Sequence, residues 1–103
     1  MERINFDSEF TSLILSGVKK TTIRKGIRSY PVGNLVELTV ENKPFAVAKV
    51  KKVVVKRISE LSEEDAKKDG FESLKDLLDK LRRIYGELGE NDFVTLVHFE
   101  LLF

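Results

Sequence analysis

The sequence predicts an α+β domain built on a small, mostly antiparallel β-barrel with flanking helices. Two observations predict this fold class. Strand-forming and helical segments are grouped along the chain instead of alternating regularly, which argues against a parallel sheet. One long strand also changes its hydrophobic phase part-way, as a strand that curves into a small barrel does. The chain has 103 residues, so we expect one domain that covers residues 1–103.

The first helical segment covers about residues 7–16. Asp7 is a typical N-cap residue, and the apolar residues Phe10, Leu13 and Ile14 follow it at helical spacing. Gly17 suits the left-handed conformation that commonly ends a helix. We therefore expect a short helix that ends just before a strand.

Two strands and two turns follow this helix. The β-branched run at residues 21–24 begins the first strand, and residues 30–34 carry turn residues. The second strand covers residues 35–40, and residues 41–44 form the next turn.

A third strand at residues 45–58 is unusually long. Its apolar residues stand at even positions up to Val50 and at odd positions from Val53 onward. Because side chains alternate between the two faces of a strand, this slip would move apolar residues to the wrong face. A β-bulge near Lys51 and Lys52 absorbs the slip and curves the strand.

Two helices and a closing strand complete the chain. The first helix has Ser62 as its cap, acidic residues in its first turn and Gly70 at its end. The second helix begins after Ser73 and ends at Gly86. Its expected core stripe consists of Leu74, Leu77, Leu78, Leu81, Ile84 and Tyr85. Alternating apolar residues at positions 93–103 predict the closing strand.

The composition excludes several kinds of site. The chain has no cysteine and one histidine, His98, so it cannot assemble a zinc or iron–sulfur site of the usual ligand spacing, although an oxygen-liganded ion stays open. We expect no cofactor. No apolar run approaches the length of a membrane span, and the first residues lack a signal-peptide pattern, so we expect a soluble cytoplasmic protein with no membrane partner. Abundant Lys and Glu favour a thermophilic source.

The charge is distributed unevenly although the net charge is only +1. Residues 18–28 and residues 49–57 each hold lysines and arginines without an acid, whereas residues 60–72 are rich in acids. The basic segments can meet phosphates or another anion, although those at 49–57 are also typical of the solvent face of a curved strand.

Residues 14–24, Ile-Leu-Ser-Gly-Val-Lys-Lys-Thr-Thr-Ile-Arg, join the predicted first helix to a strand and concentrate charge and hydroxyl groups. This junction is the first candidate site. It resembles the signature of the ASCH domain, a branch of the PUA-like barrels: Gly17, then Lys19, Thr22 and Arg24. The segment of residues 66–71, the leucine-rich helix after it and the closing strand resemble later parts of that family.

The resemblance implies a PUA-like barrel with a cleft between barrel and helices, and an association with RNA or modified nucleobases. In a bacterial subset that hydrolyses acetylcytidine, the residues matching Lys19 and Thr22 act as proton acceptor and nucleophile. A threonine hydroxyl needs such a base, and a lysine serves only if burial or a neighbouring cation lowers its pKa; Lys20 and Arg24 are candidate neighbours. Asp69 stands where those hydrolases carry glutamate as proton donor, and its shorter side chain is a departure from their pattern.

Each candidate residue also has an ordinary structural interpretation. Lys19 and Lys20 are typical solvated surface lysines, and Thr22 is a typical strand-former. Asp69 is typical of a helix end before a glycine. His98 shares its strand face with a glutamate, so we expect it to be exposed.

Three functions therefore stay open. The first is an RNA- or nucleotide-binding module in which Lys19, Lys20, Arg24 and Arg28 contact phosphate. Thr22 or Asp69 reads a base edge in this hypothesis, and Tyr30 is the candidate for stacking. The second is a metal-independent amidohydrolase of acetylcytidine that uses Lys19, Thr22 and Asp69. The third is a structural or protein-interaction domain. We favour the first, with RNA or a modified nucleoside as the expected partner.

Overall fold

The computed structural model describes residues 1–102; the expected last strand residue, Phe103, lies outside the described residues. In chain order the elements are β1 (Glu2–Asn5), η1 (Ser8–Phe10), α1 (Thr11–Leu15), β2 (Thr21–Lys25), β3 (Leu35–Val40), β4 (Lys43–Arg57), η2 (Ile58–Glu60), α2 (Glu63–Lys68), α3 (Leu74–Tyr85) and β5 (Phe93–Leu101). The α+β prediction is confirmed. None of the helices among these residues is long and apolar enough to cross a membrane.

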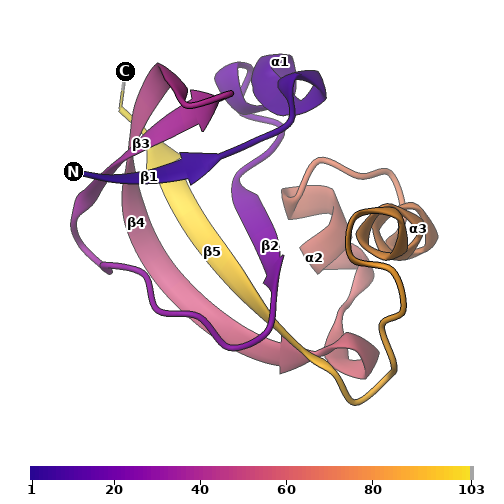
Figure 1. Cartoon of the computed structure of the whole chain (residues 1–103). Helices are drawn as coiled ribbons and strands as arrows, with labels where there is room; N and C mark the ends of the chain where they lie inside the picture. Colours follow the sequence, from indigo (N-terminus) through magenta and orange to yellow (C-terminus); the bar gives the residue numbers. More distant parts are fainter. Residues whose placement is uncertain (103) are drawn as a thin grey trace.

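The strands form one mixed sheet that curls into a half-barrel (Figure 1). The strand order is β1-β3-β4-β5-β2, and every pair is antiparallel except β1 with β3, which is parallel. The expected barrel therefore stays open between its two edge strands, β1 and β2. Strand β1 was missed by the sequence analysis, because Ile4 is the one apolar residue in its four and its partner β3 lies more than thirty residues away.

The predicted bulge in the long strand is confirmed. Val50 of β4 pairs with Phe99 of β5, and the next partner, His98, pairs with Lys52, so Lys51 is the extra residue. Val50 on one side of the bulge is buried, and Val53 on the other side packs against the same core cluster. The bulge thus keeps apolar residues on one face although their sequence phase changes.

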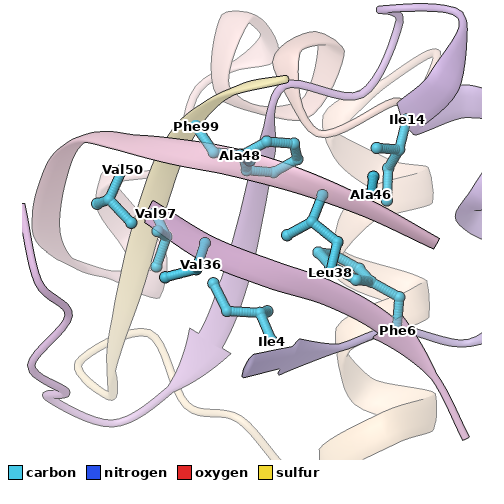
Figure 2. Close-up of a cluster of buried hydrophobic side chains, with 10 residues drawn as sticks. All are labelled: Ile4, Phe6, Ile14, Val36, Leu38, Ala46, Ala48, Val50, Val97 and Phe99. Carbon is cyan, nitrogen blue, oxygen red and sulfur yellow. The ribbon is translucent and has the colours of Figure 1, made fainter. Parts of the chain in front are cut away.

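Apolar side chains pack on both faces of the curled sheet. The inner cluster gathers around Leu38, Val36 and Phe99, as Figure 2 shows. The outer cluster lies between the sheet and α2 and α3, where Leu77 and Leu81 are buried. The predicted stripe of α3 is wrong at one position, because Ile84 is 49% exposed. The two helices therefore cover the outer face of β5 and β2.

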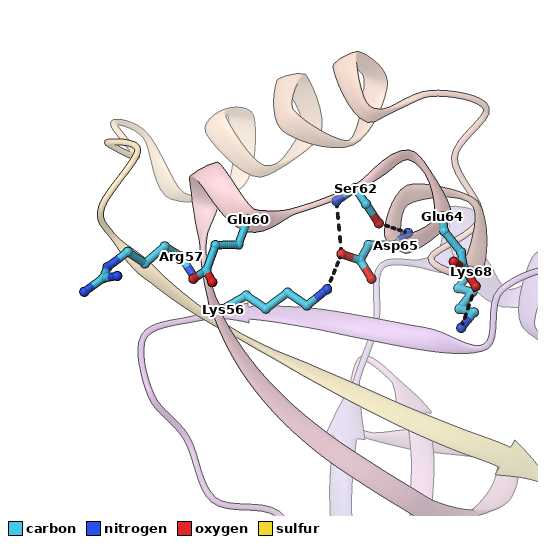
Figure 3. Close-up of polar contacts among 7 residues, drawn as sticks. All are labelled: Lys56, Arg57, Glu60, Ser62, Glu64, Asp65 and Lys68. Carbon is cyan, nitrogen blue, oxygen red and sulfur yellow. Dashed lines mark hydrogen bonds and ion pairs between the residues drawn. The ribbon is translucent and has the colours of Figure 1, made fainter.

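Local capping fixes where the helices begin. Ser62 and Asp65 form a capping box at the start of α2, and Asp65 also accepts a 2.7 Å hydrogen bond from Lys56 Nζ (Figure 3). The first predicted helix differs from expectation. It is a 3₁₀ turn, η1, followed by the five-residue α1, and Asp7 makes no side-chain cap hydrogen bond. This short helical segment ends inside the junction of residues 14–24.

Candidate functional site

A pocket of about 260 Å³ opens where β1 and β2 leave the half-barrel unclosed. Its walls come from the N-terminal segment and η1, from β2 and the residues before it, from the end of α2 and from one face of α3. The lining residues are Asn5, Phe6, Asp7, Phe10, Lys19, Thr22, Ile23, Arg24, Asp69, Phe71, Leu77, Lys80, Leu81, Ile84 and Tyr85. Four elements distant in sequence thus contribute to one concave site.

Lys19 is buried rather than solvated, with 3% of its surface exposed. Its Nζ lies 3.1 Å from Asp69 Oδ1 and donates a 2.9 Å hydrogen bond to the backbone oxygen of Asp69. The ammonium also lies over two aromatic rings, at 4.7 Å from the centre of Phe10 and 5.9 Å from that of Phe71. The surface interpretation of Lys19 is therefore wrong.

Asp69 is equally buried, at 4% exposed, and follows the last residue of α2. Its Oδ1 accepts a 2.8 Å hydrogen bond from the hydroxyl of Thr21 in addition to the contact with Lys19. The backbone N–H of Lys20 also donates to the oxygen of Lys68 at 2.7 Å. These bonds join the residues before β2 to the end of α2.

Gly70 permits this close approach. Its φ is +91°, a conformation that side chains rarely adopt, and a Cβ there would lie 3.3 Å from Lys19 Cβ and 3.4 Å from Leu13 Cδ1. The backbone conformation therefore favours glycine, and a side chain there would also press on Lys19. The sequence pattern Asp69-Gly70 is more than a helix end.

Burial governs the titration of the pair. It lowers the pKa of Lys19, against the opposing charge and hydrogen bond of Asp69, and the nearby Arg24 lowers it further. Burial likewise raises the pKa of Asp69, against the opposing effects of Lys19 and Thr21. Both directions favour the neutral forms, which is the condition that a lysine base and a carboxylic acid donor need near neutral pH.

Thr22 and Arg24 line the pocket from β2. Arg24 Nε donates to the hydroxyl oxygen of Thr22 at 3.0 Å, and its Nη2 donates to the backbone oxygen of Asn5 at 2.8 Å. The guanidinium also lies 5.3 Å from the ring centre of Phe6. Arg24 thus bridges the opening between β1 and β2, and the Thr22 hydroxyl keeps its own proton available for another acceptor.

Three predicted site residues do not line this pocket. Lys20 is exposed next to it. Arg28 donates its backbone N–H to Thr95 and its Nε to the oxygen of Lys25, at the far end of β2. Tyr30 packs against the inner core cluster, so it is not placed to stack on a ligand in the pocket.

Other pocket residues were missed as site residues. Phe10 and Phe71 lie edge to face with ring centres 6.3 Å apart. On α3, Lys80 forms an ion pair with Glu9 and lies 5.5 Å from the Phe10 ring centre, and Tyr85 lines the wall nearby. A usable signal was present: Tyr85 ends the apolar stripe of α3 and Lys80 lies beside it, where side chains reach the edge of the buried face. Within residues 1–102, no group of three or more His, Cys, Asp or Glu side chains is arranged to hold a metal ion.

The ASCH domain model matches residues 2–102, nearly the whole chain. The chain belongs to the ASCH domain family. Similar solved structures include the ASCH domain from Lactobacillus crispatus JV V101, with a TM-score of 0.80 and 21% identity over 97% of this chain and 79% of that chain. Protein EF3133 from Enterococcus faecalis V583 has a TM-score of 0.86 and 15% identity over 99% and 76% of the two chains. ASCH from Zymomonas mobilis has a TM-score of 0.71 and 17% identity over 95% and 65%.

These solved structures share the fold of this chain at identities too low to carry over an activity. No curated protein is significantly similar to the sequence. The resemblance found in the junction of residues 14–24 is thus confirmed at the level of family and fold, and the function must be argued from the pocket itself.

Proposed function

We propose that the ASCH protein binds an RNA nucleotide, with its base in the pocket between β2 and α3. One observation carries this proposal: aromatic rings and fully buried hydrogen-bonding groups line the same small pocket. Flat rings suit stacking on a base, and buried polar groups suit reading its edge. The volume of about 260 Å³ favours one base or nucleoside over a larger ligand.

Each wall has a role in this proposal. Phe10, Phe71 and Tyr85 supply the apolar and aromatic walls. Thr22 and the pair of Lys19 with Asp69 supply donors and acceptors for the base edge. Their positions are fixed by hydrogen bonds within the protein, so little ordering is needed when a ligand binds.

A second function is supported by the same three polar residues. Lys19, Thr22 and Asp69 share one pocket, and burial lowers the pKa of Lys19 and raises that of Asp69. In an amidohydrolase the Thr22 oxygen attacks the acetyl carbon while its proton passes to neutral Lys19. The amide C–N bond then breaks as protonated Asp69 gives its proton to the leaving amine, and water hydrolyses the acetyl ester on Thr22.

One experiment separates these functions. We would titrate the purified protein with cytidine, acetylcytidine and an eight-nucleotide single-stranded RNA by calorimetry, and follow acetylcytidine by chromatography. Binding without turnover supports the first function, and metal-independent turnover that disappears in Lys19→Met supports the second. Lys25→Met is the matched control, because Lys25 is an exposed lysine of β2 outside the pocket.

Two more variants complete the experiment. Tyr85→Leu keeps apolar bulk but removes the ring, so we expect it to weaken binding of every nucleoside that binds the wild type. Activity that appears or rises in Asp69→Glu would show that the shorter donor limits hydrolysis. Absence of both binding and turnover for all ligands would refute both functions.

A further inference from the structure

A second basic group, of two lysines and one histidine, lies on the outer face of the sheet, beside the residues that build the pocket. Thr21 of β2 pairs with His98 of β5, and His98 pairs with Lys52 of β4. Lys68, at the end of α2, precedes Asp69 and accepts the backbone hydrogen bond from Lys20. The residues at the start of β2 and at the end of α2, which line the pocket, therefore lie between it and the side chains of Lys52, Lys68 and His98. We call these three side chains the outer basic patch.

The charges around His98 show how basic this patch is. Lys52 and Lys56 of β4 and Lys68 of α2 all act on His98 to lower its pKa, after the larger effect of its own burial, and Asp65 of α2 opposes them. Asp65 is already bound by Lys56 at 2.7 Å. His98 is partly buried rather than exposed as expected. The electrostatic potential around His98 therefore attracts an anion.

Acids do not cancel the patch. Lys68 contacts Glu64 at 3.2 Å, but that glutamate side chain is mostly exposed, so the pair is weak and easily exchanged (Figure 3). Glu100 of β5 is paired with Lys51 of the bulge. Lys52 makes no ion pair in residues 1–102, and it is free to contact a ligand.

We propose that Lys52, Lys68 and His98 bind the phosphodiester backbone of the RNA strand whose base occupies the pocket. This inference rests on the proposed binding function and makes an oligonucleotide, not a free nucleoside, the preferred ligand. Neighbouring strands lie about 5 Å apart, so Lys52 is about 10 Å from β2 across the sheet. A single strand of about four nucleotides is long enough to contact both the pocket and the patch.

The test compares a nucleoside with an oligonucleotide. Fluorescence anisotropy of a labelled eight-nucleotide single-stranded RNA measures affinity at about 50 and 200 mM salt, and calorimetry measures the nucleoside. Each phosphate contact to a single strand contributes a slope of about −0.7 in log affinity against log salt. Relative to 1 M salt, one contact therefore strengthens binding about eightfold at 50 mM and about threefold at 200 mM. We expect Lys52→Ala and Lys68→Ala each to cause these losses for the RNA and to leave nucleoside affinity within about twofold.

The control is Lys43→Ala, which removes an exposed lysine at the other end of β4. Lys52 lies nine positions further along the chain, which corresponds to about 30 Å of strand, so the RNA affinity and salt slope of Lys43→Ala should match the wild type. NMR of the single histidine adds a local measurement: bound phosphate should raise the pKa of His98.

The possible failures are distinguishable. Patch variants with an unchanged salt slope would overturn the inference, and so would a polyglutamate peptide that binds the patch as tightly as RNA. Nucleoside binding without tighter RNA binding would overturn it while leaving the proposed function intact. If neither nucleoside nor RNA binds, the proposed function fails and the inference fails with it.

Discussion

Replacing Lys19 by methionine should reveal the cost of an unpaired buried carboxylate. In the wild type, Lys19 Nζ makes two contacts with Asp69, and the aromatic rings of Phe10 and Phe71 exclude water from the amine. Methionine fills similar space but leaves the charge of Asp69 with the Thr21 hydroxyl as its remaining side-chain partner. Breaking a buried ion pair by removing one partner costs about 3–5 kcal/mol. That is a large part of the about 5–15 kcal/mol that stabilises a typical domain.

The loss should depend on pH in a defined direction. Without Lys19, the pKa of Asp69 rises further above its ordinary value of 3.8, because burial continues to raise it and the opposing charge is gone. A carboxyl whose pKa is higher in the folded state binds its proton more tightly there. The folded variant is therefore most stable at low pH and loses stability as pH rises through the folded-state pKa. The loss in free energy of unfolding relative to the wild type should therefore be smaller near pH 4.5 than near pH 8.

Urea denaturation at both pH values measures these free energies of unfolding. The double variant Lys19→Met/Asp69→Asn removes both charges and keeps an acceptor for Thr21, so it should recover about 2 kcal/mol of the loss at pH 8. It also keeps the prediction testable if the single variant does not fold. A deficit below about 1 kcal/mol at pH 8, or a double variant no more stable than the single one, would refute the reasoning.

Three further predictions concern the backbone and the patch. Deleting Lys51 removes the extra residue but leaves Val50 and Lys52 opposite Phe99 and His98 in a regular register, so β4 keeps its faces and loses its bend; thermal unfolding followed by circular dichroism should stay cooperative with a lowered midpoint. Gly70→Ala should cost about 2–3 kcal/mol in denaturant unfolding, against about 1 kcal/mol for Gly33→Ala, because both have positive φ but Gly33 has open space around it. The NMR signal of His98 should titrate below 6.5, and Lys52→Ala should raise that pKa by removing a nearby cation.

Local patterns were sufficient to predict most of the fold. The phase change between Val50 and Val53 located the bulge, and the Ser62 cap located α2. Both signals arise from neighbours in sequence, where the physical rules are strict. Strand β1 gave no such signal, since its four residues contain one apolar side chain and it gains its stability by pairing with distant β3.

The pocket was predictable only in part, for the same reason. The junction of residues 14–24 concentrates charge and hydroxyl groups, and the family resemblance associated Lys19 and Thr22 with Asp69. From composition alone a lysine is expected to be solvated, because a buried ammonium group needs a partner. The partner of Lys19 is Asp69, which lies fifty residues later in the chain. The contribution of Lys80 from α3 likewise depends on how the helix packs over the opening.

The unclosed side of the half-barrel has a consequence for folding order. Strands β3, β4 and β5 pair extensively with one another, whereas β1 is held by a short parallel pairing with β3 and by the hydrogen bond from Arg24 to Asn5. Because so short a pairing contributes little stability, β1 should dock after the rest of the sheet, and its amides should exchange with solvent sooner. Because Asn5 and Phe6 line the pocket, the site is completed only in that last step. A ligand in the pocket would therefore slow amide exchange in a strand that it barely touches.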